Sequence, residues 1–203
     1  MKTLPNKRVA KSTRAKKTKK PKEPKLTLLQ VGVQKYAHLI QRGTVLAIDP
    51  SSGSEGSMPG YAYYVQGELT SYGTIELPAG TEIHIRLQVL CRTLIDQFQV
   101  PDVLILENIA PYINGNSKGV INLHKSIGVV TASIPCKYLI EIAPMSWKTR
   151  LRRAGLEQIY VKSDVNDAIY MGHCVVEDAF NYLHAELPPF DFSLLTKANY
   201  TRA

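Results

Sequence analysis

The sequence predicts an α/β fold, in which a mixed five-stranded sheet is flanked by helices. Three short apolar runs between residues 44 and 77, with a hairpin signal between the second and third, predict antiparallel strands. From residue 81 to 183, stretches with helical spacing then alternate with apolar runs, which is typical of strand–helix crossovers and parallel strands. A chain of 203 residues suffices for one such domain with a real core, but not for two large ones.

The first predicted strand is Thr44–Asp49, a short apolar run stopped by Asp49-Pro50. Residues 51–59 are rich in glycine and serine and predict a loop. Tyr61–Gln66 and Leu69–Leu77 follow as two strands around Gly67-Glu68. These elements predict the antiparallel half of the sheet.

The second half alternates helices with strands. Thr81 resembles an N-cap, and the helix after it ends before Pro101. Its apolar residues recur at helical spacing, at Ile83, Leu87, Leu90, Leu94 and Phe98. The later elements are a strand at Asp102–Ile109, a helix at Gly119–Ile134, a strand at Lys137–Ile142, a short basic helix at Pro144–Ala154 closed by Gly155, and a long helix at Ser163–Leu183.

Charge divides the chain unevenly. Residues 1–26 hold 11 Lys and Arg and one acid, a net of +10, whereas the other 177 residues have a net charge of −2. The segment has too few apolar groups to offset its chain entropy, so we expect a disordered basic arm for nucleic acid; a solubilising tail and a targeting peptide are the alternatives. The arm's candidate contacts are Lys16, Lys17, Lys19 and Lys20. The predicted divisions are the arm, an amphipathic lead-in at 27–43 that is ambiguous between helix and strand, the α/β domain itself at 44–190 and a C-terminal tail at 191–203.

Several classes are excluded by composition. Cys91, Cys136 and Cys174 form no Cys-x-x-Cys pair, which argues against a disulfide framework or a zinc ribbon and fits a reducing compartment. The apolar runs are too short to span a bilayer, and the start lacks a signal-peptide region. The absence of a phosphate-binding Gly-x-x-x-x-Gly-Lys-[Ser/Thr] loop argues against a P-loop NTPase. We therefore expect a cytoplasmic protein without a membrane partner.

Four acids stand at structurally related places. Asp49 ends the first strand and Glu107 the fourth, so neighbouring strands would bring both to one edge of the sheet. Asp164 and Asp167 lie three residues apart at the start of the last helix, along one edge of its apolar stripe. Each acid alone has an ordinary explanation, as a turn residue or as a helix cap. Together they would repel by about 4 kcal/mol per pair at roughly 4 Å, which hard cations such as Mg²⁺ or Mn²⁺ would offset, and they suit two-metal phosphodiester hydrolysis.

At this point the chain resembles the RuvC-type Holliday-junction resolvases of the ribonuclease H-like superfamily over approximately residues 44–183. The resemblance depends on four motifs that follow one another in the expected order. They are Ala47-Ile48-Asp49-Pro50, Ile105-Leu106-Glu107, Ile142-Ala143-Pro144-Met145-Ser146-Trp147-Lys148 and Asp164-Val165-Asn166-Asp167-Ala168.

The resemblance implies a ribonuclease H-like fold and a metal-dependent endonuclease that cleaves four-way DNA junctions in a bacterial or virus-infected cell. It implies that Asp49, Glu107, Asp164 and Asp167 are catalytic carboxylates holding two Mg²⁺ ions, for which Mn²⁺ can substitute. Lys148 resembles the catalytic lysine that contacts the scissile phosphate, and Lys162 a second backbone contact. The family acts as a homodimer, here through the helix Gly119–Ile134, with candidate contacts at Ile121, Leu123, Ile127 and Val130.

Further DNA contacts follow from local positive charge. Arg150, Arg152 and Arg153 join Lys148 and Lys162 in a basic cluster close in sequence to the acidic helix, whose alternative is an ordinary solvated face. Lys118 follows the loop after the fourth strand, and Tyr112 in that loop is the aromatic residue nearest to the position where the resemblance implies an aromatic wedge.

The sequence also departs from the family. Ser51 replaces the family's glycine, and Ala110 stands where an aromatic wedge is expected. An alternative register would place Asp178 in the site in place of Asp164 and Asp167. We expect His173 to be a surface or capping residue and Trp147 to anchor the short helix. An RNA-processing nuclease, a transposase-like enzyme and a catalytically inactive nucleic-acid-binding protein remain alternative functions.

Overall fold

The computed structural model describes residues 28–51, 58–98, 100–108 and 118–196, without the side chains of residues 28–31 and 118. The basic arm and Tyr112 lie outside the described residues. The helices are α1 (Leu28–Arg42), α2 (Ile83–Phe98), α3 (Lys118–Ser133), α4 (Pro144–Arg153), α5 (Asp164–Tyr182) and the short 3₁₀ helix η1 (Phe192–Thr196). The strands are β1 (Thr44–Asp49), β2 (Gly60–Val65), β3 (Glu68–Thr74), β4 (Val103–Glu107) and β5 (Tyr138–Ile142).

The five strands form one mixed sheet in the order β3-β2-β1-β4-β5. The pairs β1–β2 and β2–β3 are antiparallel, while β1–β4 and β4–β5 are parallel. The strands of the hairpin therefore occupy one side of the sheet, and the strands joined by helical crossovers occupy the other. This confirms the predicted fold class, an α/β fold with a mixed five-stranded sheet in which three antiparallel strands are followed by parallel crossovers.

The hairpin between β2 and β3 turns one residue earlier than predicted. Its central residues are Gln66 and Gly67, with φ angles of 52° and 85°. Two successive positive φ angles are what a tight hairpin turn of type I′ requires. Glu68 therefore belongs to β3, where it pairs with Val65, and not to the turn.

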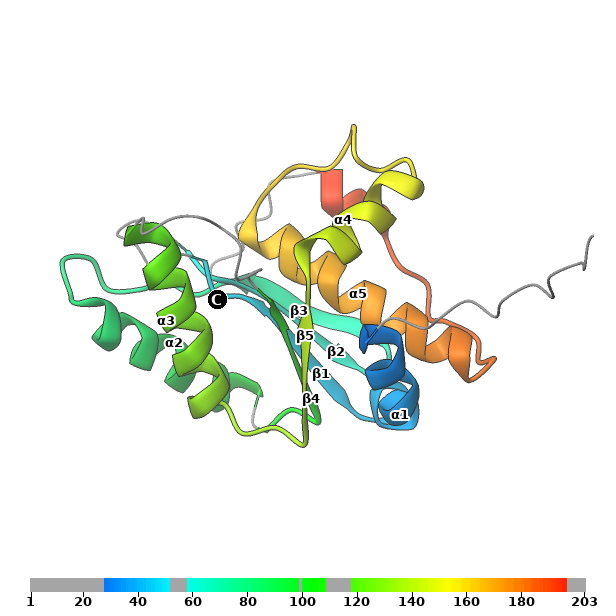
Figure 1. Cartoon of the computed structure of the whole chain (residues 1–203), viewed down its shortest axis with the longest axis horizontal. Helices are drawn as coiled ribbons and strands as arrows, with labels where there is room; N and C mark the ends of the chain where they lie inside the picture. Colours follow the sequence, from blue (N-terminus) through cyan, green and yellow to red (C-terminus); the bar gives the residue numbers. More distant parts are fainter. Residues whose placement is uncertain (1–27, 52–57, 99, 109–117, 197–203) are drawn as a thin grey trace, which may run out of the picture.

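The ambiguous lead-in is a helix, α1. Its side chains at Val33, Ala37 and Ile40 are buried and lie at helical spacing. These residues join a core cluster that also contains α5 and β5 (Figure 1). The helix is thus stabilised mainly by a face that packs on elements more than a hundred residues later.

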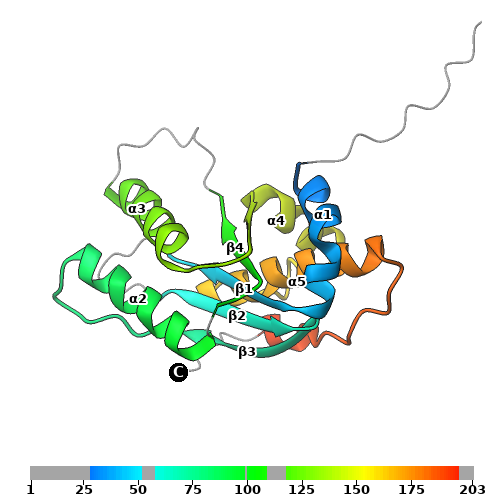
Figure 2. The ribbon, with the colours of Figure 1, turned by 90° about the horizontal axis from the view of Figure 1, so that it is seen from below.

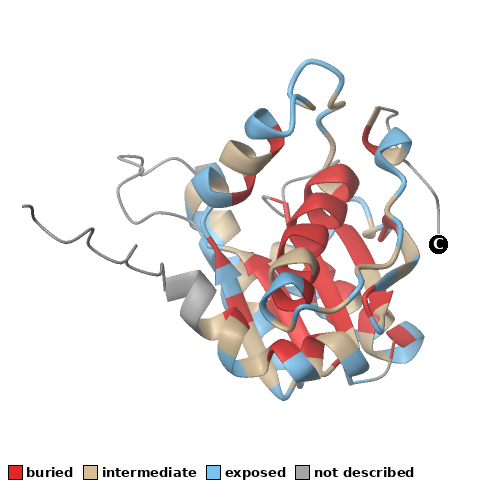
Figure 3. Ribbon diagram, turned by 90° about the vertical axis from the view of Figure 1, so that its right-hand side faces the viewer, coloured by how far each residue is buried: buried red, intermediate tan, exposed pale blue. Residues whose placement is uncertain are grey.

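Helices cover both faces of the sheet (Figures 1 and 2). Alternate residues of β1 separate the two cores: Leu46 and Ile48 face α2 and α3, while Val45 and Ala47 face α1, α4 and α5. Figure 3 shows that α5 is deeply buried, and 14 of its 19 residues are buried.

The packed body includes η1, within the segment predicted as a C-terminal tail. Leu195 of η1 is buried in the α5 core, and its carbonyl accepts a hydrogen bond from the Val161 N–H at 2.8 Å. No helix that the structure describes is long and apolar enough to cross a bilayer.

Candidate active site

The register of the parallel strands brings two predicted carboxylates to one edge of the sheet. Asp49 and Glu107 are the last residues of β1 and β4, and the preceding residues, Ile48 and Leu106, are partners across the two strands. Because side chains alternate along a strand, Asp49 lies on the same face as Ala47, and Glu107 lies on the same face as Ile105. That face packs against α5, the helix that carries the other two acids.

The start of α5 is brought to the same edge by a glycine. Gly60 pairs with Asp49 across β1 and β2. A Cβ at this glycine would stand 2.2 Å from the backbone carbon and oxygen of Asp164 and 2.3 Å from the Val165 nitrogen. Only a residue without a side chain lets the start of β2 approach the first turn of α5 so closely. Gly60 therefore allows Asp164 to lie near Asp49.

The first turn of α5 has a conventional cap. The Ser163 hydroxyl accepts a hydrogen bond from the Asn166 N–H at 3.1 Å. The acids at Asp164 and Asp167 therefore are not needed as caps. Asp167 is buried and Asp164 is half-buried, so the two acids face the interior edge of the site and not the solvent.

The four carboxylates are electrostatically coupled. Burial raises the pKa of Asp49 well above its usual value, and repulsion from the other three acids raises it further. Burial, followed by repulsion from Asp167, raises the pKa of Asp164 to about 6. Burial also raises the pKa of Glu107 and of Asp167, while Lys148 and Lys162 oppose both shifts. Removing these groups from water and grouping their charges are thus both unfavourable.

Three of the carboxylates have one oxygen held by a hydrogen-bond donor. The Ser51 N–H donates to Asp49 Oδ1 at 3.2 Å, and the Trp147 indole N–H donates to Glu107 Oε1 at 3.1 Å. The Tyr160 hydroxyl donates to Asp167 Oδ1. Ser51 has a φ of 50°, so the left-handed backbone conformation is adopted at this position without glycine.

The chemistry of the acids fits a hard divalent cation. They are oxygen donors of like charge in a partly buried position, which is the ligand set that Mg²⁺ and Mn²⁺ prefer. In the part of the chain that the structure describes, no three His, Cys, Asp or Glu side chains stand close enough together to hold one ion. The carboxylates therefore form an electrostatically coupled group and not a finished coordination shell.

The predicted basic cluster is divided between two sides of α4. Lys148 Nζ lies 3.9 Å from Glu107 Oε1, and Lys162 is exposed beside the acids. Arg150 instead forms ion pairs with Glu177 and with Asp178 of α5, the latter at 2.7 Å. Lys148 and Arg150 are thus close in sequence but face different partners, because positions 148 and 150 point about 200° apart around a helix.

The other basic candidates have different surroundings. Arg152 pairs with Glu157 at 3.3 Å on the surface, and Arg153 is exposed. Lys118 is the first residue of α3, but its side chain lies outside the described residues, as do those of Lys16, Lys17, Lys19 and Lys20.

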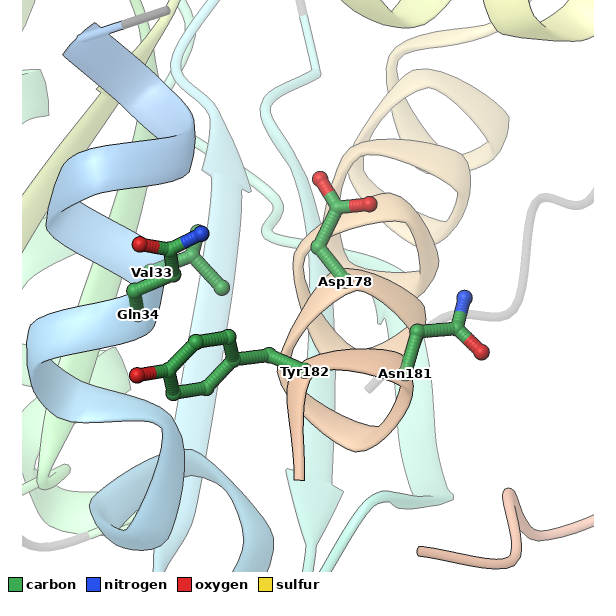
Figure 4. Close-up of a pocket in the computed structure, with 5 residues that line it drawn as sticks. All are labelled: Val33, Gln34, Asp178, Asn181 and Tyr182. Carbon is green, nitrogen blue, oxygen red and sulfur yellow. The ribbon is translucent and has the colours of Figure 1, made fainter. Parts of the chain in front are cut away.

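Asp178, the alternative site residue, lies elsewhere on α5. It faces a cavity of about 270 Å³ between α1 and α5, lined also by Val33, Gln34, Asn181 and Tyr182 (Figure 4). Burial raises its pKa, Arg150 opposes that shift, and repulsion from Glu177 adds to it. Its electrostatic partners are therefore those of an ion pair between helices.

The prediction for His173 is wrong, whereas the prediction for Trp147 is confirmed. His173 is buried and stacks on Phe190 at a centroid distance of 3.9 Å, so the prediction of a surface residue is wrong. It lies on the stripe of α5 that packs under the C-terminal segment, a contact that helical spacing alone does not reveal. Trp147 is fully buried and anchors α4, as predicted, and it also donates to Glu107.

The proposed dimer helix, α3, is only partly available for a partner. Val130 is buried in the α2–α3 core, and Ile127 packs against that core, because this side of the helix covers the sheet. Leu123 is half-buried. Ile121 is 45% exposed, so it is the apolar candidate that points outward.

Sequence reasoning missed two contributors to the site. Gly60 precedes a predicted strand without any sign that α5 approaches it, and Tyr160 lies in a loop with no motif. A half-buried tyrosine seven residues before an acid is not a signal by itself. Both roles arise from contacts between distant elements.

No protein-family model matches the chain, and no curated protein sequence does. Among solved structures, RuvC from Thermus thermophilus in complex with a Holliday junction substrate is similar with a TM-score of 0.49 and 15% identity, covering 69% of this chain and 95% of that chain. Another structure of T. thermophilus RuvC has a TM-score of 0.48 at 15% identity, covering 70% and 97%. The fowlpox virus Holliday junction resolvase has a TM-score of 0.38 at 16% identity, covering 66% and 98%.

Proposed function

We propose that this chain is a divalent-metal-dependent endonuclease that cleaves four-way DNA junctions as a homodimer. One observation carries the proposal: four mutually repelling acids, from β1, β4 and α5, gather at one edge of the sheet. Such a group is costly to bury, and its charge suits cations together with a phosphate substrate.

Asp49, Glu107, Asp164 and Asp167 would hold two Mg²⁺ ions, for which Mn²⁺ would substitute. Bound there, the ions would supply Lewis-acid stabilisation of the phosphate and activation of water. The protein's own contribution is orientation: Ser51, Trp147 and Tyr160 hold one oxygen of their respective carboxylates.

Lys148 is suited to contact the phosphate. Its ammonium group lies beside Glu107 and 4.7 Å from the centroid of the Trp147 ring. The side chain is 43% exposed, so it reaches from the carboxylate group to the surface where DNA would approach. Lys162, Arg152 and Arg153 would add contacts to the DNA backbone.

A homodimer would present two such sites to the two opposed strands of a junction. We propose the outward side of α3, with Ile121 at its centre, as the contact between copies. Val130 cannot take part because it is buried within the chain. The arm of residues 1–26, with its net charge of +10, would add affinity for DNA without contributing to the chemistry.

The test is cleavage of a synthetic four-way junction in Mg²⁺ by the full chain and by Asp49→Asn. We expect the variant to lose cleavage and to keep most of its junction binding. We also expect its metal-free Tm to rise, because the change removes one of four repelling charges from a buried position. A loss of cleavage together with a higher Tm cannot be explained by unfolding.

Asp178→Asn is the matched control. It removes an acid from the same helix that contains two of the four carboxylates, but it breaks an ion pair with Arg150 and leaves the site intact. We expect it to lower the Tm and to retain cleavage. If Asp178→Asn abolishes cleavage and Asp164→Asn does not, the alternative register is correct.

The substrate panel separates the remaining alternatives. Equal cleavage of linear duplex or of an RNA–DNA hybrid would contradict junction selectivity and leave a nuclease. The absence of cleavage in both Mg²⁺ and Mn²⁺, with binding retained, would identify a binding protein of this fold.

A further inference from the structure

Two aromatic side chains donate hydrogen bonds to two of the four carboxylates. The Trp147 indole N–H contacts Glu107 Oε1 at 3.1 Å, and the Tyr160 hydroxyl contacts Asp167 Oδ1. The two rings are neighbours, with centroids 6.4 Å apart. This pair of neighbouring aromatic side chains therefore contacts acids from two different elements, β4 and α5.

Both donors are held firmly by the rest of the fold. Trp147 is fully buried in α4 and also meets the edge of the Tyr170 ring at 6.3 Å. The Tyr160 N–H donates to the Leu156 carbonyl at 2.9 Å, and the next residue, Val161, donates to Leu195 at 2.8 Å. The donors are thus fixed before any ligand binds.

An ionised carboxylate offers only acceptor oxygens, so in this contact the Tyr160 hydroxyl is the donor and Asp167 Oδ1 is the acceptor. Each donor contacts a single oxygen of its carboxylate, an arrangement in which the carboxylate can still offer its other oxygen to a cation.

We propose that Tyr160 and Trp147 are positioning residues that orient Asp167 and Glu107 for divalent metal binding. The inference rests on the proposed function, since it assigns the outer support of the same site. Donors behind ligating carboxylates fix their direction, and the loss of one such partner typically weakens metal affinity 10- to 100-fold.

The principal test is Mn²⁺ titration of the DNA-free full chain, wild type beside Tyr160→Phe, followed by electron paramagnetic resonance of the unbound ion. The substitution removes one hydroxyl and keeps the ring. We expect Mn²⁺ to bind Tyr160→Phe about 10- to 100-fold more weakly than the wild type. The concentration of Mg²⁺ that half-saturates junction cleavage should rise in parallel, and junction binding in EDTA should not change.

Tyr64→Phe is the matched control, because it also removes a buried hydroxyl that packs against α5. That hydroxyl donates to the Ile169 carbonyl at 2.5 Å and contacts none of the four carboxylates. We expect this control to lower the Tm while Mn²⁺ affinity stays within about twofold of the wild type. Trp147→Phe provides a second variant on the Glu107 side, with a weaker affinity for Mn²⁺ expected there as well.

The outcomes separate the two proposals. Wild-type protein that binds Mn²⁺ no more tightly than Tyr160→Phe would overturn the positioning role and leave the nuclease proposal standing. Equal weakening in Tyr64→Phe would show that the effect reflects stability and not orientation. A wild type that binds no Mn²⁺ would overturn both proposals together.

Discussion

Gly60 is the position at which the smallest change should disturb the site most. In Gly60→Ala, the new Cβ would stand 2.2 Å from the Asp164 carbonyl carbon and oxygen, whereas ordinary contact begins at 3.4 Å. The two backbones must therefore separate by about 1.2 Å, and no flexible side chain is present to yield. Because Gly60 pairs with Asp49, the displacement lies between Asp49 and Asp164.

A displacement of about 1 Å between reacting groups can lower a rate about 100-fold. We therefore expect Gly60→Ala to reduce junction cleavage by about that factor at saturating DNA and Mg²⁺. Overpacking should also cost about 1 to 3 kcal/mol of stability. The assays are single-turnover cleavage and urea unfolding at a temperature where the variant is folded.

Gly172→Ala separates the two effects. A Cβ at Gly172 would stand 2.4 Å from the Tyr64 ring and 3.2 Å from the Ala47 side chain. The substitution therefore overpacks the contact between α5 and the sheet, as Gly60→Ala does, but at a position more than one turn along α5 from the acids. We expect a similar loss of stability with nearly normal cleavage. If Gly172→Ala loses as much activity as Gly60→Ala, or if Gly60→Ala cleaves at the wild-type rate, the geometric argument fails.

Three further predictions concern other parts of the chain. Burial lowers the pKa of His173 from 6.5 to about 4, so between these pH values the unfolded chain binds a proton that the folded chain does not. The free energy of unfolding of the wild type, relative to that of His173→Phe, should therefore fall by about 3 kcal/mol from pH 7 to pH 4. Urea unfolding at the two pH values measures this difference. Gln66→Asn should raise that free energy by about 0.5 to 1 kcal/mol, because Asn tolerates the positive φ of the hairpin turn better; an unchanged midpoint in urea would contradict this. Deleting residues 1–26 should weaken junction binding and flatten its salt dependence, with cleavage at saturating DNA nearly unchanged; a truncation without turnover at saturation would refute this role.

Much of the fold could be predicted because its strands carry local signals. The strand Thr44–Asp49 was bounded by an apolar run and by Asp49-Pro50, and the structure has the same bounds. The hairpin was displaced by one residue because its turn depends on the φ angles of Gln66 and Gly67. The lead-in is ambiguous from sequence because its helical conformation depends on packing of its apolar residues against α5, which is distant in the chain.

Two of the carboxylates, Asp49 and Glu107, were accessible to sequence reasoning for a topological reason. Parallel strands end at the same edge of a sheet, so acids that end such strands are brought together without further information. Gly60 and Tyr160 were not accessible, since each acts through a contact with α5 that the local sequence does not encode. The basic residues show the same limit: Lys148 and Arg150 are two positions apart, yet one reaches Glu107 and the other pairs with Glu177 and Asp178.

The division of the basic residues has a consequence for how many cations the site can hold. The groups that act on one another there are four carboxylates and two ammonium groups, Lys148 and Lys162. Four negative charges against two positive charges leave a formal charge of −2 when all are ionised. One divalent ion balances that charge, whereas a second would leave an excess of positive charge in a partly buried position.

The negative charge that a second ion needs would therefore come from the DNA phosphate. We expect Mn²⁺ titration of the DNA-free chain to find one ion per site at micromolar to low millimolar Mn²⁺, and a second only when junction DNA is bound. Asp49→Asn would prevent cleavage during the measurement but would also remove a ligand. The DNA-bound arm therefore uses the wild type with a junction whose central backbone linkages cannot be hydrolysed. Two ions of similar affinity in the absence of DNA would show that Lys148 and Lys162 do not set the charge of the site.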